Sequence, residues 1–133
     1  MREISSEELR EILEAHKLWL ESREEEGRRA DLTGADLSKI DLTGAFLGTV
    51  NLSGANLSGV NLIKANLSFA DLYKADLTGA DLTGADLYYT SFWGAILYKA
   101  DLRVATAKDC WIKGAKFSSP KDRARLLMLG AYG

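Results

Sequence analysis

The chain repeats itself every five residues from Ala30 to Ser119. This stretch of 90 residues divides into 18 units without an insertion. The third position of a unit is Leu, Ile or Phe in 17 units, and Ala107 is the exception. The second position is Asp or Asn in 12 units, and the fifth position is Gly in eight. A fixed internal period decides the architecture of a chain before any other signal does.

A period of five fits neither an α-helix nor a flat strand. On a helix, five residues advance by about 500°, so successive leucines would lie about 140° apart and form no stripe. On a flat strand, an odd period would place successive leucines on opposite faces. Both conflicts disappear if the chain turns after each unit, because the first and third residues then face a common axis. Gly tolerates the positive φ of such corners, and Ser, Thr, Asp and Asn side chains bond turn N–H groups. The period therefore predicts a solenoid.

The tandem, which begins ADLTG-ADLSK-IDLTG, resembles the pentapeptide-repeat family over 90 of the 133 residues. The resemblance implies an all-β solenoid, a right-handed quadrilateral β-helix with four units per coil, and so about 4.5 coils for 18 units. At ~4.8 Å between stacked strands, such a rod is about 22 Å long. We expect a local narrowing or a bulge at Ala107, where the column is thin. The structural core is predicted to be Leu32, Leu37, Leu42, Leu47, Leu52, Leu57, Leu62, Leu67, Leu72, Leu77, Leu82, Leu87, Phe92, Leu97, Leu102, Ile112 and Phe117.

The segments that flank the repeats read as helical caps. We divide the chain into an N-terminal capping helix (1–29), the β-helix (30–119), and a C-terminal capping helix with a tail (120–133). Ser5 and Glu8 form a capping-box pattern that predicts a helix over about residues 6–24, which ends before Gly27 and packs on the first coil. Ser119 and Pro120 predict the start of the second helix. Caps cover the open ends of a solenoid. Residues 126–133 leave two interpretations open, a cap alone or a self-association surface.

The sequence offers little material for catalysis. His16 is the only histidine and Cys110 the only cysteine, and the repeats place them at opposite ends of the rod, which argues against a Cys–His pair. We expect both side chains to be buried and structural, with a ligand or base role for His16 and a reactive thiol at Cys110 as the alternatives. The glycines follow the five-residue period rather than the spacing of a phosphate-binding loop. We therefore predict no enzyme, no cofactor and no metal site.

Charge and hydropathy exclude several other classes of protein. The 17 Lys and Arg residues nearly balance the 19 Asp and Glu residues, which gives no support for direct binding to nucleic acid or to a membrane. No apolar run approaches the roughly 18 residues that cross a bilayer, and the N-terminus lacks the apolar region of a secretory signal. A cytoplasmic location, in a protein of bacterial type, is the default expectation.

Residues twenty apart would stack on the outer wall, so the Asp and Asn residues form polar ladders such as Asp31, Asn51 and Asp71. We expect these side chains to bond turn N–H groups, with a functional acidic surface as the alternative. Family members that protect DNA gyrase resemble duplex DNA in shape and charge. Residues 30–119 carry nine Asp against eight Lys or Arg. A rod of about 22 Å would need about thirteen negative charges to match DNA, so DNA-mimicking gyrase protection is the weaker alternative function.

Aromatic side chains interrupt the consensus in the C-terminal half. At the twenty-residue spacing, Phe69 stacks on Tyr89, and Tyr73 stacks on Trp93. Aromatic residues are enriched at interfaces, so a contiguous exposed patch indicates a contact site. Two other interpretations stay open: the aromatics cover a wall of small residues, or the C-terminal segment folds back over them. The candidate interaction surface, named here the aromatic edge, comprises Phe69, Tyr73, Tyr88, Tyr89, Trp93 and Trp111.

The predicted function is a rigid, non-enzymatic interaction module. It binds an unknown protein partner or its own copy through the aromatic edge. A homodimer through the C-terminal end or through the aromatic edge is part of the same hypothesis. An uncharacterised enzyme that depends on His16 or Cys110 is the least favoured alternative.

Overall fold

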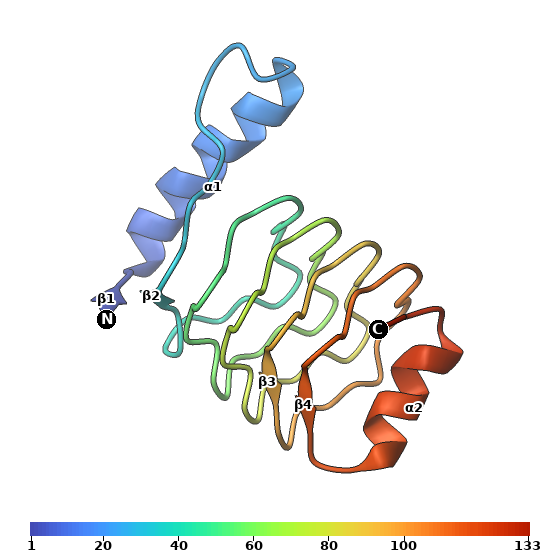
Figure 1. The fold of residues 1–133 in the computed structure, drawn as a ribbon. Helices are drawn as coiled ribbons and strands as arrows, with labels where there is room; N and C mark the ends of the chain where they lie inside the picture. Colours follow the sequence, from blue (N-terminus) through green and yellow to red (C-terminus); the bar gives the residue numbers. More distant parts are fainter.

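The computed structural model describes residues 1–133 and shows a β-helix solenoid, a stack of coils with a helix at each end (Figure 1). The strands hold only two residues each, because the chain turns after every five-residue unit. In chain order the elements are β1 (Arg2–Glu3), α1 (Ser6–Glu21), β2 (Ala35–Asp36), β3 (Ile96–Leu97), β4 (Lys116–Phe117) and α2 (Pro120–Met128).

Parallel pairing between coils has a register of twenty residues. Asp31 pairs with Asn51, Asn51 with Asp71, and Asp71 with Ser91. Strands β3 and β4 keep the same register, whereas β1 adds to β2 from outside the repeats. Between coils the backbone bonds are short: the Leu52 N–H donates to the Asp71 carbonyl at 2.8 Å. Four five-residue units therefore separate each residue from the one stacked on it.

The fifth position of the units forms the corners, as its glycines predict. Gly54 and Gly59 have φ values of 66° and 67°. Lys64, Phe69 and Tyr89 adopt the same left-handed conformation at the fifth position, at φ values of 58°, 59° and 53°. Glycine is frequent at these corners because the left-handed region costs a residue with a Cβ about 1–2 kcal/mol.

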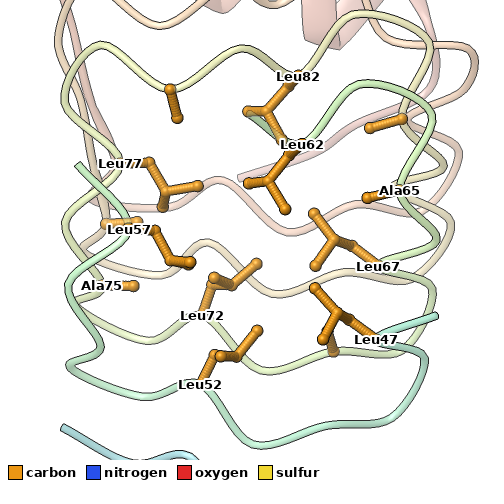
Figure 2. Packing of buried hydrophobic residues seen from close by; sticks show 14 of the residues in the cluster. Leu47, Leu52, Leu57, Leu62, Ala65, Leu67, Leu72, Ala75, Leu77 and Leu82 are labelled. Atoms are coloured by element: carbon orange, nitrogen blue, oxygen red, sulfur yellow. The ribbon is translucent and has the colours of Figure 1, made fainter. Parts of the chain in front are cut away.

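The third positions line an apolar interior. Sixteen of the seventeen predicted core side chains are at most 3% exposed, and Figure 2 shows leucines from successive coils pointing into the same space. Phe117 is only partly buried, although it packs against the same hydrophobic cluster. Alanines such as Ala65 and Ala75 stand beside the leucines and let the walls approach closely.

The regular pairing breaks just before Ala107, where the leucine column is interrupted. The Ala105 N–H donates to the Ala85 carbonyl at 2.9 Å, whereas one coil earlier the equivalent Ala65 carbonyl accepts from Asp86. The bond is thus displaced by one residue, which is the signature of a bulge. The expected irregularity is present, and Ala107 itself stays fully buried.

Helix α1 begins as predicted but ends earlier than predicted. The Ser5 hydroxyl accepts a hydrogen bond from the Glu8 N–H at 3.0 Å and caps the first turn. The helix stops at Glu21 rather than near residue 24, because Arg23 and Glu24 take φ values of 57° and 73°. Gly27 then lies against the helix, where a Cβ atom would overlap the Ala15 carbonyl oxygen.

His16 fastens α1 to the first coil. Its side chain is fully buried, and its Nδ1 atom accepts a hydrogen bond from the Ala30 N–H at 3.0 Å. A backbone N–H can only donate, so Nδ1 carries no proton and the ring proton lies on Nε2. Nε2 donates to the Gly48 carbonyl at 2.7 Å. The histidine therefore joins the helix to both ends of the first coil.

The C-terminal segment returns to the stack after α2. Leu126 of α2 is fully buried and belongs to the same hydrophobic cluster as the leucine column. The chain then pairs Tyr132 with Trp111, and the Ile112 N–H donates to the Tyr132 carbonyl at 3.0 Å. Part of the last coil is thereby covered by backbone, which satisfies strand groups that would otherwise stay open.

A charge placed at a third position is expected to unfold the rod. Replacing a buried leucine by alanine costs about 2–5 kcal/mol, and an unpaired buried carboxylate costs more. Leu67→Ala should lower the free energy of unfolding by that amount, and Leu67→Asp should abolish the cooperative transition followed by circular dichroism. Ile63→Asp, which adds the same charge outside the wall, is the matched control. Wild-type melting of Leu67→Asp would contradict the inward assignment.

Removing the His16 ring is expected to release α1 while the repeats stay folded. His16→Leu leaves the Ala30 N–H without a partner, at a cost of about 1–3 kcal/mol, whereas the Gly48 carbonyl still accepts a hydrogen bond from the Thr49 hydroxyl. Hydrogen exchange should show faster exchange in residues 6–21 and little change in residues 50–100. Glu11→Leu, on the exposed side of α1, is the control. Unchanged protection of α1 in His16→Leu would show that the histidine does not hold the helix.

Candidate functional site

The Asp and Asn side chains of the polar ladders form hydrogen bonds within their own turns. All twelve Asp and Asn side chains at second positions accept a hydrogen bond from the backbone N–H two residues later. At Asp31 this bond is 3.0 Å long, and the Thr33 hydroxyl donates to the same oxygen at 2.6 Å. These side chains stabilise corners, as the structural interpretation of the ladders predicts.

The same hydrogen bonds favour the ionised carboxylates. Hydroxyl donors lower the pKa values of Asp31, Asp36 and Asp41, with the backbone N–H groups adding to the effect. The Arg103 guanidinium bonds Asp101 and lowers the pKa of that carboxyl to about 2. A carboxyl of this kind is a poor proton donor or acceptor near neutral pH, so these four side chains are poorly suited to general acid or base catalysis.

The single thiol is also poorly suited to nucleophilic chemistry. Cys110 is fully buried, and burial raises the pKa of its thiol to about 12. The neutral thiol is a weak nucleophile. No group of three or more His, Cys, Asp or Glu side chains is placed to hold a metal ion. No helix is long and apolar enough to cross a bilayer.

The aromatic edge contains two stacked groups, one at the fifth position of a unit and the other at the fourth position of the next unit. In the first group the rings of Phe69 and Tyr89 are parallel within 2°, with centroids 5.1 Å apart, and Tyr88 meets both rings edge-on. In the second group Tyr73 stacks on Trp93 with centroids 4.9 Å apart. The stacking follows from the twenty-residue register, which places side chains of successive coils one above the other.

Several of these rings face solvent. The exposed fractions are 53% for Phe69, 40% for Tyr73 and 46% for Tyr89. The Lys74 ammonium lies 5.2 Å from the centre of the Tyr73 ring and 6.0 Å from that of Trp93. The second group is therefore bordered by a cation that is attracted to the faces of both rings.

Trp111 lies in a third pair and not in either stack. Its ring meets Tyr132 edge-on, with centroids 4.7 Å apart. The C-terminal segment thus covers the Trp111 side of the aromatic edge, as one of the sequence interpretations allows. Tyr132 is itself 44% exposed, and the sequence pattern did not identify it because α2 interrupts the five-residue period before it.

The comparison with known families matches the region of the repeats. The family model described as pentapeptide repeats matches in eight copies, over residues 27–48, 50–79, 65–103 and 80–118. The chain belongs to the pentapeptide-repeat family. Its solved relatives include the pentapeptide repeat protein Rfr23 from the cyanobacterium Cyanothece 51142, at 36% identity and a TM-score of 0.41. That alignment covers 66% of this chain and 53% of Rfr23.

Two further solved structures share the pentapeptide-repeat fold. A pentapeptide repeat protein of the Arabidopsis thaliana thylakoid lumen is 27% identical with a TM-score of 0.53, over 78% of this chain and 80% of that one. QnrB1, a plasmid-mediated fluoroquinolone resistance protein, is 19% identical with a TM-score of 0.51, over 72% of this chain and 43% of QnrB1. The chain spans about half the length of Rfr23 and of HetL, a pentapeptide repeat protein from the cyanobacterium Nostoc sp. Strain PCC 7120. A search of curated proteins found no match.

The pentapeptide-repeat rod also carries an apolar groove that the sequence pattern did not identify. The groove lies between α1 and the first coil and has a volume of about 680 Å³. Its sequence signal is Phe46, which replaces the usual Asp or Asn at a second position and is 46% exposed. We name it the α1 groove; its lining residues are Ser6, Leu9, Arg10, Leu13, Glu14, Lys17, Leu20, Glu21, Ile40, Asp41, Leu42, Ala45 and Phe46.

Acid is expected to destabilise the rod through the ladder carboxylates. A folded-state pKa below the ordinary value of 3.8 favours the folded state above about pH 4, and this contribution is lost as the pH falls toward about 2. The melting temperature should therefore fall between pH 4 and pH 2. The fall should be smaller in a variant with Asn at positions 31, 36, 41 and 101, because Asn61 makes the same turn with an amide oxygen. An equal fall in both proteins would contradict this assignment.

Proposed function

We propose that this chain is a rigid, non-enzymatic module that binds another protein through the aromatic edge. The rod is a right-handed, four-sided β-helix of about 4.5 coils, in line with 18 units and a register of twenty residues. The observation that carries the proposal is the pair of aromatic stacks, Phe69 with Tyr89 and Tyr73 with Trp93, in which three rings are exposed and Trp93 is partly buried.

The backbone at the first stack supports a role beyond covering the wall. Phe69 and Tyr89 occupy left-handed corners, at φ values of 59° and 53°, where glycine is the common residue. A bulky residue there lowers the stability of the fold by about 1–2 kcal/mol, and an aromatic stack raises it by about 0.5–1.5 kcal/mol. The aromatics therefore bring no clear gain in stability over glycine. Binding is a reason for their presence that does not depend on stability.

The shape of the aromatic edge favours a protein over a small molecule. Small ligands bind in concave sites that enclose most of their surface. None of the four hollows on this molecule is lined by a residue of the aromatic edge. An exposed ridge of Tyr, Trp and Phe is typical of the central part of a protein–protein interface.

Gyrase protection through the acidic ladders is less well supported. The likeness to QnrB1 is at 19% identity and concerns the fold. Each ladder carboxylate already bonds its own turn, and residues 30–119 carry nine Asp against eight Lys or Arg. A surface of this charge lacks the density of duplex DNA, which carries about one negative charge per 1.7 Å. Inhibition of gyrase supercoiling by the purified protein would favour this alternative.

Loss of the Tyr73–Trp93 stack is expected to weaken partner binding strongly. Aromatic residues at the centre of an interface contribute about 2 kcal/mol or more, so Tyr73→Ser with Trp93→Ser should weaken binding about thirtyfold or more. Affinity capture with purified bait, followed by titration of the captured protein, measures the effect. The double variant should keep the circular dichroism of the wild type.

Tyr98→Ser provides the matched control for that experiment. Tyr98 is 44% exposed but belongs to the next unit, on another face of the rod. A partner that binds the wild type and Tyr98→Ser, but not the double variant, supports the proposal. If the double variant binds as tightly as the wild type, the aromatic edge is not the binding surface.

A further inference from the structure

The two ends of the rod carry opposite charges, although the whole chain has a net charge of only −2. Residues 1–26 contain nine Glu against four Lys or Arg, and residues 99–125 contain eight Lys or Arg against three Asp. Helix α1 lies at one end of the stack and α2 at the other (Figure 1). The molecule is therefore acidic at its α1 end and basic at its α2 end, so that a head-to-tail encounter of two copies is electrostatically favourable.

The acidic end offers a hydrophobic recess. The floor of the α1 groove includes Leu13 and Phe46, and its rim includes Glu14, Glu21 and Asp41. Two cations also line the groove. Arg10 forms a loose ion pair with Glu14 at 3.5 Å, and Lys17 forms one with Glu21 at 3.8 Å. Both glutamates are more than half exposed, so these pairs contribute little and exchange readily with an incoming cation.

The basic end offers a hydrophobic projection. Leu127, Met128 and Leu129, named here the α2 tip, are 42%, 87% and 39% exposed. The neighbouring Leu126 is fully buried, which holds the tip in place against the rod. Lys121 and Arg125 lie beside Met128 and Leu129 around a shallow hollow. The tip thus combines exposed apolar side chains with two adjacent cations.

We propose that the α2 tip of one copy docks in the α1 groove of a second copy. Met128 and Leu129 enter the apolar floor, while Lys121 and Arg125 face the acidic rim. A groove of about 680 Å³ lies within the range of 300–1,000 Å³ that encloses a ligand of several side chains' size. Because the two surfaces differ, the contact is heterologous and leaves one free groove and one free tip in every pair. The assembly therefore grows as a row of rods and does not stop at a symmetric dimer.

This inference is independent of the proposed function. The docking surfaces contain no residue of the aromatic edge, so either proposal can fail without the other. If both hold, a row of rods presents several aromatic edges in line, and a partner with several binding segments gains avidity.

Charge-reversal variants test the proposed contact between the α2 tip and the α1 groove. Sedimentation velocity of the full chain at about 50 mM salt should show concentration-dependent association that weakens severalfold at about 500 mM salt, where the Debye length is much shorter. Glu14→Lys with Glu21→Lys should weaken association at least about tenfold, and so should Lys121→Glu with Arg125→Glu, because like charges then meet. A mixture of the two variants should associate again. Tyr73→Ser with Trp93→Ser should associate like the wild type.

Cross-linking tests the direction of docking. With a short bismaleimide, a Glu14→Cys copy and a Met128→Cys copy should cross-link to each other, while neither variant cross-links to itself. Cys110 does not interfere because it is fully buried. Cross-linking of Met128→Cys alone would show a symmetric contact between α2 ends and overturn the proposal. A chain that stays monomeric at low salt up to about 0.5 mM, far above the Kd range of specific pairs, would overturn it as well, and would leave the groove to a different occupant.

Discussion

Burial of one leucine in every five-residue unit is the interaction on which the rest of the rod depends. A fully buried leucine contributes about 1.5–3 kcal/mol, and neighbouring coils supply the contacts for each other's side chains. Keeping every leucine on one axis forces a corner after each unit, and the fifth position takes left-handed backbone in 15 of the 18 units. The Asp and Asn side chains then bond the N–H groups that the corner leaves free. Most residues of the repeats are needed for this packing and for these turns, and the interior has no space for a substrate.

The proposed functions therefore rest on positions where the repeat departs from its consensus. The aromatic edge replaces small residues of the wall, Phe46 replaces a turn-forming Asp or Asn, and the α2 tip lies outside the repeats altogether. These departures lie on a frame whose outer side chains are fixed by the stacking of one coil on the next. Such a frame holds the aromatic rings in place, and in the proposed complex this lowers the entropy lost on binding.

The sequence predicted the features that depend on the period and missed those that depend on where the ends pack. The inward leucines and the stacking of Tyr73 on Trp93 follow from counting by five and by twenty. The end of α1 at Glu21 did not, because it depends on left-handed residues after the helix rather than on Gly27. The α1 groove also escaped prediction, since it arises where a non-repeating segment packs on the coils. The sequence left open that the C-terminal segment folds back over the aromatics, but it did not single out Tyr132. Phe46 was the available sign of the groove.

The central claim is that a dry leucine column forces all recognition onto the outer surface. A high-resolution crystal structure of the full chain tests it most directly, through the electron density along the axis of the coils. The account predicts continuous side-chain density from Leu32 to Ile112 with no ordered water between them, and the rings of Tyr73 and Trp93 stacked outside. Leucines that point alternately to solvent, or a hydrated channel wide enough for a metabolite, would contradict it.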